Sequence, residues 1–229
     1  MNDVLLEVEA LNAFYGRAHI LFDIDLHVKR GEVVALIGRN GAGKSTIMKA
    51  IIGLVDRVTG SIRFKGRDIV GVEPHVIARS GLGNVPEDRR IFTELTVREN
   101  LEVGRQPPRA GAVEWSVEKV FALFPNLAER ADRLASHMSG GEQKMLAVAR
   151  TLMGNPYLLL LDEPSEGIAP VIAEAMIRVI LELKREGTAI LLSEQNTRFA
   201  ELVCDRSYVL ESGVAVASLE SLSLLRQRK

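Results

Sequence analysis

The stretch GRNGAGKST, residues 38–46, constrains the fold of this chain more than any other feature. It matches the pattern G-x-x-x-x-G-K-[ST] through Gly38, Gly43, Lys44 and Ser45. It follows EVVALIG, a continuous apolar run that is typical of a strand buried on both faces of a sheet. A strand, a glycine-rich loop and the start of a helix therefore come in the order that a phosphate-binding loop requires.

The residue types in this loop predict how a nucleotide would be held. Glycines let the backbone curl so that several N–H groups point at the phosphates, and the start of the helix adds a partial positive charge. Lys44 would reach the β- and γ-phosphates, and Ser45 would be a ligand of Mg²⁺. The predicted cofactors are ATP and Mg²⁺. The predicted nucleotide-binding residues of the loop are Gly38, Arg39, Asn40, Gly41, Ala42, Gly43, Lys44, Ser45 and Thr46.

A pair of acidic residues ends another apolar run. In LLLLDEP, Asp162 and Glu163 precede Pro164. Alone, such a pair is also consistent with an acidic turn at the end of a strand. In a chain that has a phosphate-binding loop, Asp162 is predicted to hold Mg²⁺ and Glu163 to orient or deprotonate the attacking water.

The rest of the pattern predicts an α/β fold with a mostly parallel core sheet. The apolar runs YLLLLD and AILLS are each followed by a helical stretch, which is typical of parallel strands with helices on the faces of a sheet. VLLEVEAL and HILFDIDLHVK alternate apolar and polar residues and predict an N-terminal antiparallel layer. The helix after the phosphate-binding loop is predicted from Lys44 to about Gly53.

Residues 86–155 predict a helical subdomain inserted into a single domain, 1–229. TVRENLEVG and AVEWSVEKVFALF carry apolar residues at helical spacing, in the second case beginning with Val113. GRQPPRAGA, residues 104–112, predicts a loop, because its prolines and glycines disfavour both helix and strand.

The composition limits the partners and the location. A formal net charge of −1 offers no bulk attraction to nucleic acid or to an anionic membrane surface. The single cysteine, Cys204, cannot form an internal disulfide framework or a multi-cysteine zinc site. The first residues lack the pattern of a secretory signal, and no apolar run approaches the roughly 20 residues that cross a bilayer. We therefore expect a soluble chain that is not exported.

A second glycine-rich helix start occurs in MSGGEQKMLAVARTLM, residues 138–153. Ser139 and Glu142 match the capping box S-x-x-E, which explains the segment without any ligand. A cap does not require two glycines, and Gly140 and Gly141 weaken the helix while leaving N–H groups exposed at its positive end. The segment is therefore also predicted to bind phosphate. Its predicted nucleotide-binding residues are Ser139, Gly140, Gly141 and Glu142.

This second surface predicts a dimer. The phosphate-binding loop surrounds only one side of its nucleotide, so another surface must close the open side. If two subunits meet head to tail, each presents the helix start at Ser139 to the γ-phosphate that the other subunit holds.

The three motifs GRNGAGKST, MSGGEQ and LLLLDEP, in this order and separation, resemble the nucleotide-binding subunit of ABC transporters along essentially the whole chain. The resemblance implies that Tyr15 stacks on adenine, whereas without it Tyr15 is read as ordinary packing at a strand end. It also implies two integral membrane permease subunits as partners, an extracytoplasmic substrate-binding protein as an indirect one, and no nucleic acid. The implied location is peripheral, at the cytoplasmic face of the cell (inner) membrane.

Two positions depart from the usual pattern of this family. Glu87 stands where a glutamine usually contacts Mg²⁺ and the membrane subunit, so Glu87 is the predicted ligand there. Gln195 stands where a histidine usually touches the γ-phosphate, and it is predicted to act in catalysis with Glu163 and Lys44. A glutamine can hydrogen-bond a phosphate but cannot carry the charge of imidazolium. Either a sister ATP-binding subunit completes the dimer and carries the full site, or Gln195 suffices and two copies of this chain pair.

The segments VPEDRRIF, DEPSEGIAP and LLSEQN resemble one branch of the family, the second ATPase of uptake systems for branched-chain (hydrophobic) amino acids. Importers of urea, amides or aromatic acids have similar ATPases and stay an alternative. A soluble, non-transport ATPase of the same superfamily is a further alternative, disfavoured because coiled coils, zinc cysteines and tandem ATPase units are not seen in this sequence. A small kinase or GTPase does not explain SGGEQ. The charged turn 87–90 is either solvated or a contact with a permease.

Overall fold

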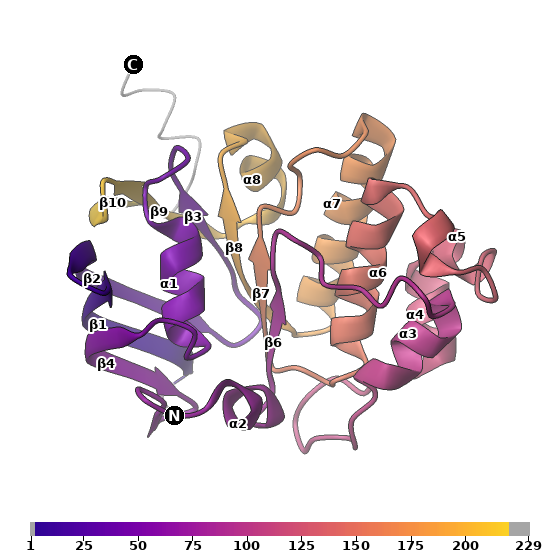
Figure 1. The fold of residues 1–229 in the computed structure, drawn as a ribbon, viewed down its shortest axis with the longest axis horizontal. Coiled ribbons are helices and arrows are strands. Elements are labelled where there is room, and N and C mark those ends of the chain that lie inside the picture. Colours follow the sequence, from indigo (N-terminus) through magenta and orange to yellow (C-terminus); the bar gives the residue numbers. More distant parts are fainter. Residues whose placement is uncertain (1–2, 220–229) are drawn as a thin grey trace.

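The computed structural model describes residues 3–219, in which two β-sheets stand beside a group of helices (Figure 1). One sheet is antiparallel, with its strands in the order β2-β1-β4-β5, and the other has the order β10-β9-β3-β8-β7-β6. The strands are β1 Val4–Tyr15, β2 Ala18–Lys29, β3 Val33–Ile37, β4 Arg57–Phe64, β5 Arg67–Asp68, β6 Leu82–Val85, β7 Leu158–Asp162, β8 Ala189–Glu194, β9 Arg206–Glu211 and β10 Val214–Leu219. The predicted antiparallel layer and mostly parallel core sheet are thus confirmed.

The predicted helices occur in the predicted order, but one predicted start is wrong and the helix at Pro74–Arg79 was not predicted. The helices are α1 Lys44–Ile51, α2 Pro74–Arg79, α3 Val97–Gly104, α4 Val117–Leu123, α5 Pro125–Ala128, α6 Gly140–Leu152, α7 Pro170–Arg185 and α8 Thr197–Val203, with a 3₁₀ turn at Ala135–His137. The prediction that AVEWSVEKVFALF is helical from Val113 is wrong, because Val113 precedes the helix. Ser116 is the N-cap of α4, and its Oγ accepts the backbone N–H of Lys119 at 3.2 Å, so the helix cannot begin earlier.

The six-stranded sheet separates two hydrophobic cores. Its strands run parallel except at the edge, where β10 pairs antiparallel with β9. Alternate side chains of β3 enter different cores: Val34 and Leu36 pack with α1 and the antiparallel sheet, whereas Ala35 and Ile37 pack with α6 and α7. α1 and α6 therefore cover opposite faces of this sheet (Figure 1).

The segment between β6 and β7 is mainly helical. It contains α3, α4, α5, the 3₁₀ turn and α6, and residues 105–116 form no helix or strand, in agreement with the loop predicted over 104–112. α6 buries Met145, Val148 and Leu152, as its spacing predicts. We infer that these helices form the subdomain predicted over 86–155, which carries the helix start at Ser139 beside the core sheet.

Candidate functional site

The phosphate-binding loop joins β3 to α1 at the carboxyl ends of the parallel strands (Figure 1). Gly43 has a φ of +105°, and a Cβ there would lie 2.7 Å from Cδ2 of Leu21, so a side chain does not fit. The residues from Arg39 to Gly41 are exposed, whereas Gly43 and Lys44 are buried. The loop thus opens to solvent at its middle and is fixed in the core where α1 begins.

Lys44 lies under this loop and contacts Glu163. It is 4% exposed, and its Nζ donates to the carbonyl oxygens of Gly38 at 2.9 Å and Arg39 at 3.1 Å. The same Nζ lies 3.0 Å from Oε1 of Glu163, whose side chain is 5% exposed. The residue predicted to bind phosphate and the residue predicted to act on water thus form a buried ion pair.

Glu163 is held in an unusual backbone conformation. Its φ is +48°, in the left-handed region, and its N–H donates to Oγ of Ser193 at 3.0 Å. Burial raises the pKa of its carboxyl, but hydrogen bonds from Glu166, Lys44 and Gln195 outweigh burial and hold this pKa below its ordinary value. Glu163 therefore stays ionised at neutral pH and can accept a hydrogen bond from water.

Asp162, the last residue of β7, faces Ser45 at the start of α1. The Oγ of Ser45 donates to Oδ1 of Asp162 at 3.1 Å, and Oγ of Ser193 donates to the same oxygen at 2.6 Å. Hydroxyl and carboxylate oxygens are ligands that Mg²⁺ accepts, usually together with phosphate oxygens and water. The pair of Ser45 and Asp162 therefore fits the predicted Mg²⁺ site.

Gln195 connects the phosphate-binding loop to Glu163. Its Nε2 donates to Oδ1 of Asn40 at 2.7 Å and to Oε2 of Glu163 at 3.1 Å. The amide thus lies between two residues that were predicted independently, one for nucleotide binding and one for catalysis. Because an amide has both a donor and an acceptor, Gln195 can exchange either bond for one to a phosphate.

The second helix start has the predicted cap. Oγ of Ser139 accepts the N–H of Glu142 at 3.4 Å, and Oε2 of Glu142 accepts the N–H of Ser139 at 2.8 Å. Gly141 packs against Ile172 of α7, since a Cβ at this position would lie 3.2 Å from Cγ1 of that residue. Packing therefore favours a glycine at position 141, and Ser139 stays exposed at the end of the helix.

Arg89 covers the first turn of this helix. A Cβ on Gly140 would lie 2.8 Å from Nη1 of Arg89, and that nitrogen donates to Oε1 of Gln143 at 3.2 Å. In the sequence Arg89 is only part of a charged turn, and tertiary packing places its charge beside Gly140.

Two predicted residues are not joined to this cluster. Glu87 and Tyr15 are exposed, and within residues 3–219 no hydrogen bond or ion pair connects either side chain to Lys44, Asp162 or Glu163. The predicted roles of Glu87 at the metal and of Tyr15 at adenine therefore remain predictions.

The structure places further charged residues beside this cluster. Burial raises the pKa of Glu194, which accepts the N–H of Ser165 at 2.8 Å. A hydrogen bond with Glu163 raises the pKa of Glu166 to about 7. Lys144 of α6 is 3% exposed, and burial lowers the pKa of its ammonium. The only sequence signal for Lys144 is its position beside Met145 on the buried side of an amphipathic helix.

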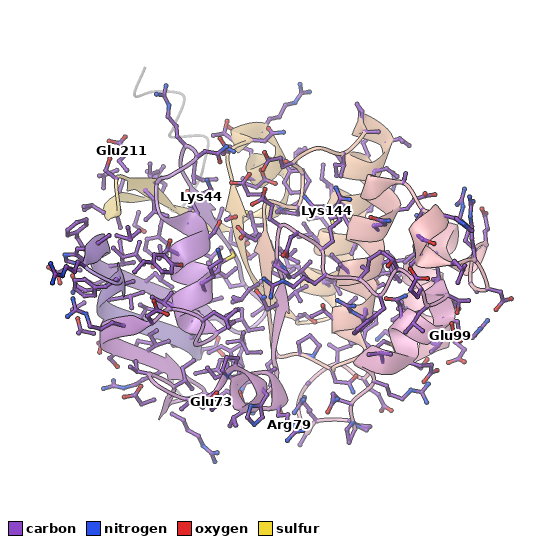
Figure 2. All side chains as sticks on the ribbon, viewed as in Figure 1. Lys44, Glu73, Arg79, Glu99, Lys144 and Glu211 are labelled. Atoms are coloured by element: carbon purple, nitrogen blue, oxygen red, sulfur yellow. The ribbon has the colours of Figure 1, made fainter. Side chains whose placement is uncertain are left out.

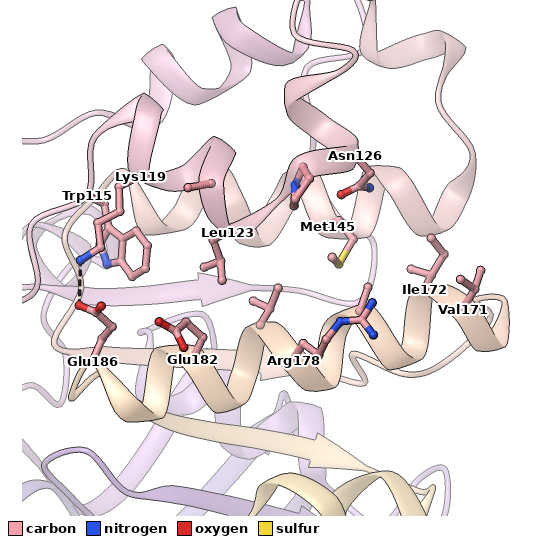
Figure 3. Close-up of a pocket in the computed structure, with 14 residues that line it drawn as sticks. Trp115, Lys119, Leu123, Asn126, Met145, Val171, Ile172, Arg178, Glu182 and Glu186 are labelled. Carbon is pink, nitrogen blue, oxygen red and sulfur yellow. Dashed lines mark hydrogen bonds and ion pairs between the residues drawn. The ribbon is translucent and has the colours of Figure 1, made fainter.

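A groove of about 690 Å³ lies apart from this site, between α4–α5 and α7 (Figure 3). Trp115 and Leu123 line one wall and Ile172 lines the other. An ion pair between Lys119 and Glu186, at 2.8 Å, crosses one end. No residue of the phosphate-binding loop lines this groove, so it is not part of the nucleotide site.

A phosphate-binding loop on a mostly parallel sheet, with an Asp-Glu pair at the carboxyl end of a strand in the same sheet, defines a P-loop ATPase. Residues 21–166 match the model of the family described as "ABC transporter", and the chain belongs to this family. It is an ATP-hydrolysing, ATP-binding subunit. Within residues 3–219, no helix combines the length and the apolar character needed to cross a membrane.

Several named relatives share nearly the whole chain. The high-affinity branched-chain amino acid transport ATP-binding protein BraG of Pseudomonas aeruginosa is 44% identical over 98% of this chain and 97% of its own length. The probable branched-chain amino acid transport ATP-binding protein LivF of Archaeoglobus fulgidus is 35% identical over 98% of this chain and 96% of its own length. The lipopolysaccharide export system ATP-binding protein LptB of Escherichia coli is 33% identical over 90% of this chain and 86% of its own length.

The fold is similar to solved structures of the same family. A nucleotide-free ATP-binding cassette from an ABC transporter superposes with a TM-score of 0.82 at 29% identity, covering 98% of this chain and 94% of that one. An ATP-bound bacterial Atm1-family ABC exporter also reaches 0.82 at 27% identity, with all of this chain matching 41% of that one.

Proposed function

We propose that this chain hydrolyses Mg-ATP to drive an importer of branched-chain amino acids. The observation that carries the proposal is the 44% identity with BraG over 98% of this chain, against 33% with the export ATPase LptB. Two relatives whose names state branched-chain amino acid transport also match almost end to end.

The proposed chemistry uses the cluster around Glu163. Lys44 exchanges its ion pair with Glu163 for the β- and γ-phosphates, and Glu163 then orients or deprotonates the attacking water. Ser45 and Asp162 would hold Mg²⁺, which would supply positive charge to neutralise the phosphates. Gln195 hydrogen-bonds the γ-phosphate. Glu87 is a further candidate ligand of Mg²⁺.

The proposed assembly is a head-to-tail dimer on two membrane permeases. The helix start at Ser139 closes the nucleotide site of the other subunit, Tyr15 stacks on adenine, and the helices of 86–155 contact the permeases. A substrate-binding protein outside the membrane delivers the amino acid. The chain then lies peripherally at the cytoplasmic face of the membrane. Two observations support this location: the chain belongs to a transporter family, and no helix within residues 3–219 could cross a membrane.

Uptake of labelled leucine, isoleucine and valine by cells that lack the gene tests the cargo. We expect the gene to restore uptake of these amino acids and the Lys44→Ala variant to restore none, because the variant has no cation at this position to bind the β- and γ-phosphates. Uptake of urea, acetamide and phenylalanine is measured in the same cells, because these compounds represent the cargo of the alternative importers. Restored uptake of one of these instead would assign the chain to the alternative importer class.

Hydrolysis by the purified chain tests the dimer. We expect the specific activity to rise with protein concentration and then level off, because two copies must meet before either site is closed. Glu163→Gln is the blank. Bound ATP without activity above this blank would show that a sister ATP-binding subunit, rather than a second copy, completes the site.

A further inference from the structure

Lys144 is a buried cation that makes no ion pair with any carboxylate in residues 3–219. It lies on α6, one turn after Gly140, and among the described residues no carboxylate is within ion-pair distance of its Nζ. Lys44 and Lys144 are labelled in Figure 2, where α1 and α6 lie on either side of the central strands. Burial of a lysine is unfavourable unless its ammonium is hydrogen-bonded, so its contacts need an explanation.

The ammonium of Lys144 donates to two carbonyl oxygens of one turn. Nζ lies 2.5 Å from the carbonyl oxygen of Glu163 and 3.1 Å from that of Glu166. These residues also close the turn themselves, because the N–H of Glu166 donates to the same carbonyl of Glu163 at 3.2 Å. Lys144 thus binds both ends of the turn that carries the proposed general base.

This turn is held from both faces of the core sheet. Lys44 of α1 contacts the carboxylate of Glu163, and Lys144 of α6 contacts its carbonyl oxygen. Ser193 of β8 accepts the N–H of Glu163. The left-handed φ of +48° at Glu163 is unfavourable for a side-chain-bearing residue, so it persists only where such contacts hold it.

We propose that Lys144 is a positioning residue for Glu163. Its two hydrogen bonds connect the turn 163–166 to the first turns of α6. The proposal rests on the proposed function. Because α6 starts at the glycines that meet the nucleotide of the other subunit, a displacement of α6 at that nucleotide is passed through Lys144 to Glu163 of the same chain. Lys144 would then connect the two ATP sites of the dimer through one hydrogen-bonded contact.

The kinetics of Lys144→Met and Lys144→Arg test this role. Methionine keeps the length and apolar stem but has no donor, so we expect kcat to fall about 10- to 100-fold, the effect of a small misplacement of a catalytic group. KM for ATP should stay within about twofold, because the ammonium of Lys144 is bound to the carbonyls of Glu163 and Glu166 rather than to the phosphate-binding loop. Arginine should retain at least about a third of kcat. A kcat within about twofold of wild type for the methionine variant would overturn the proposal.

Two controls separate positioning from loss of structure. Lys119→Met removes a lysine that pairs with Glu186 outside the site and should leave kcat unchanged. In a Glu163→Gln background, Lys144→Met should still form the ATP-dependent dimer in size-exclusion chromatography. Loss of that dimer would overturn the proposal, because it would assign Lys144 to dimer formation.

If Lys144→Met does not fold, the Lys144→Gln variant is used for the same measurement. Its amide has donors but is one bond shorter, so it cannot reach both carbonyl oxygens, and kcat should fall at least about threefold at unchanged KM. An unchanged kcat would overturn the proposal. A wild-type chain that neither binds nor hydrolyses ATP, in contrast, would contradict the proposed function itself, and the two failures are therefore distinguishable.

Discussion

Replacing Glu163 by glutamine is expected to lower kcat for ATP hydrolysis by about 10²- to 10³-fold, the contribution of a positioned general base. Glutamine has the same shape and can keep the hydrogen bond with Gln195, but it cannot take a proton from water. Steady-state hydrolysis with saturating Mg-ATP measures the effect.

The same substitution is expected to tighten ATP binding several-fold. In the wild-type chain the phosphates compete with the carboxylate of Glu163, 3.0 Å away, for the ammonium of Lys44. A neutral amide weakens that competition, since hydrogen bonds to charged groups contribute about 1.5–3 kcal/mol. Titration with a fluorescent ATP analogue gives the dissociation constant. Glu186→Gln, which removes a carboxylate paired with Lys119, should change neither quantity.

Unchanged affinity in Glu163→Gln would show that Lys44 is not shared between Glu163 and the nucleotide. A kcat near that of wild type would show instead that another group activates water, with Glu166 the nearest carboxyl to consider, because its pKa of about 7 reflects a hydrogen bond with Glu163.

Lys44→Met is expected to weaken ATP binding by about 10- to 100-fold, corresponding to the loss of about 1.5–3 kcal/mol of charge-assisted hydrogen bonds. It should also lower the melting temperature, because Glu163 is then left 5% exposed with no cation beside its carboxylate. The double variant Lys44→Met, Glu163→Gln should recover the melting temperature but not the affinity. This pattern separates the two roles of the lysine.

Lys49→Met is the matched control for Lys44→Met, because Lys49 lies on the same helix but is exposed. Its ATP affinity and melting temperature should equal those of wild type. If Lys44→Met bound ATP as tightly as Lys49→Met, the phosphate-binding role of Lys44 would be wrong.

The elements that could be predicted from sequence are those with a strong local cause. The glycines of the phosphate-binding loop, the apolar runs of β3, β7 and β8, and the capping box at Ser139 each depend on neighbours within a few residues. Strands β4, β5, β9 and β10 were not predicted, because charged and polar residues interrupt their apolar pattern. The start of α4 was wrong at Val113 because a serine cap overrides apolar spacing.

The sequence by itself determined the class of this protein, since three ordered motifs specify a P-loop ATPase of the ABC transporter family before any contact is known. Only the tertiary structure decided how the site is held together. Gln195 bridges Asn40 and Glu163, 155 and 32 residues away. Lys144 reaches the turn at Glu163 from the opposite face of the sheet to Lys44. Such contacts join segments distant in the chain, and they depend on packing between helices and sheet, which no local pattern encodes.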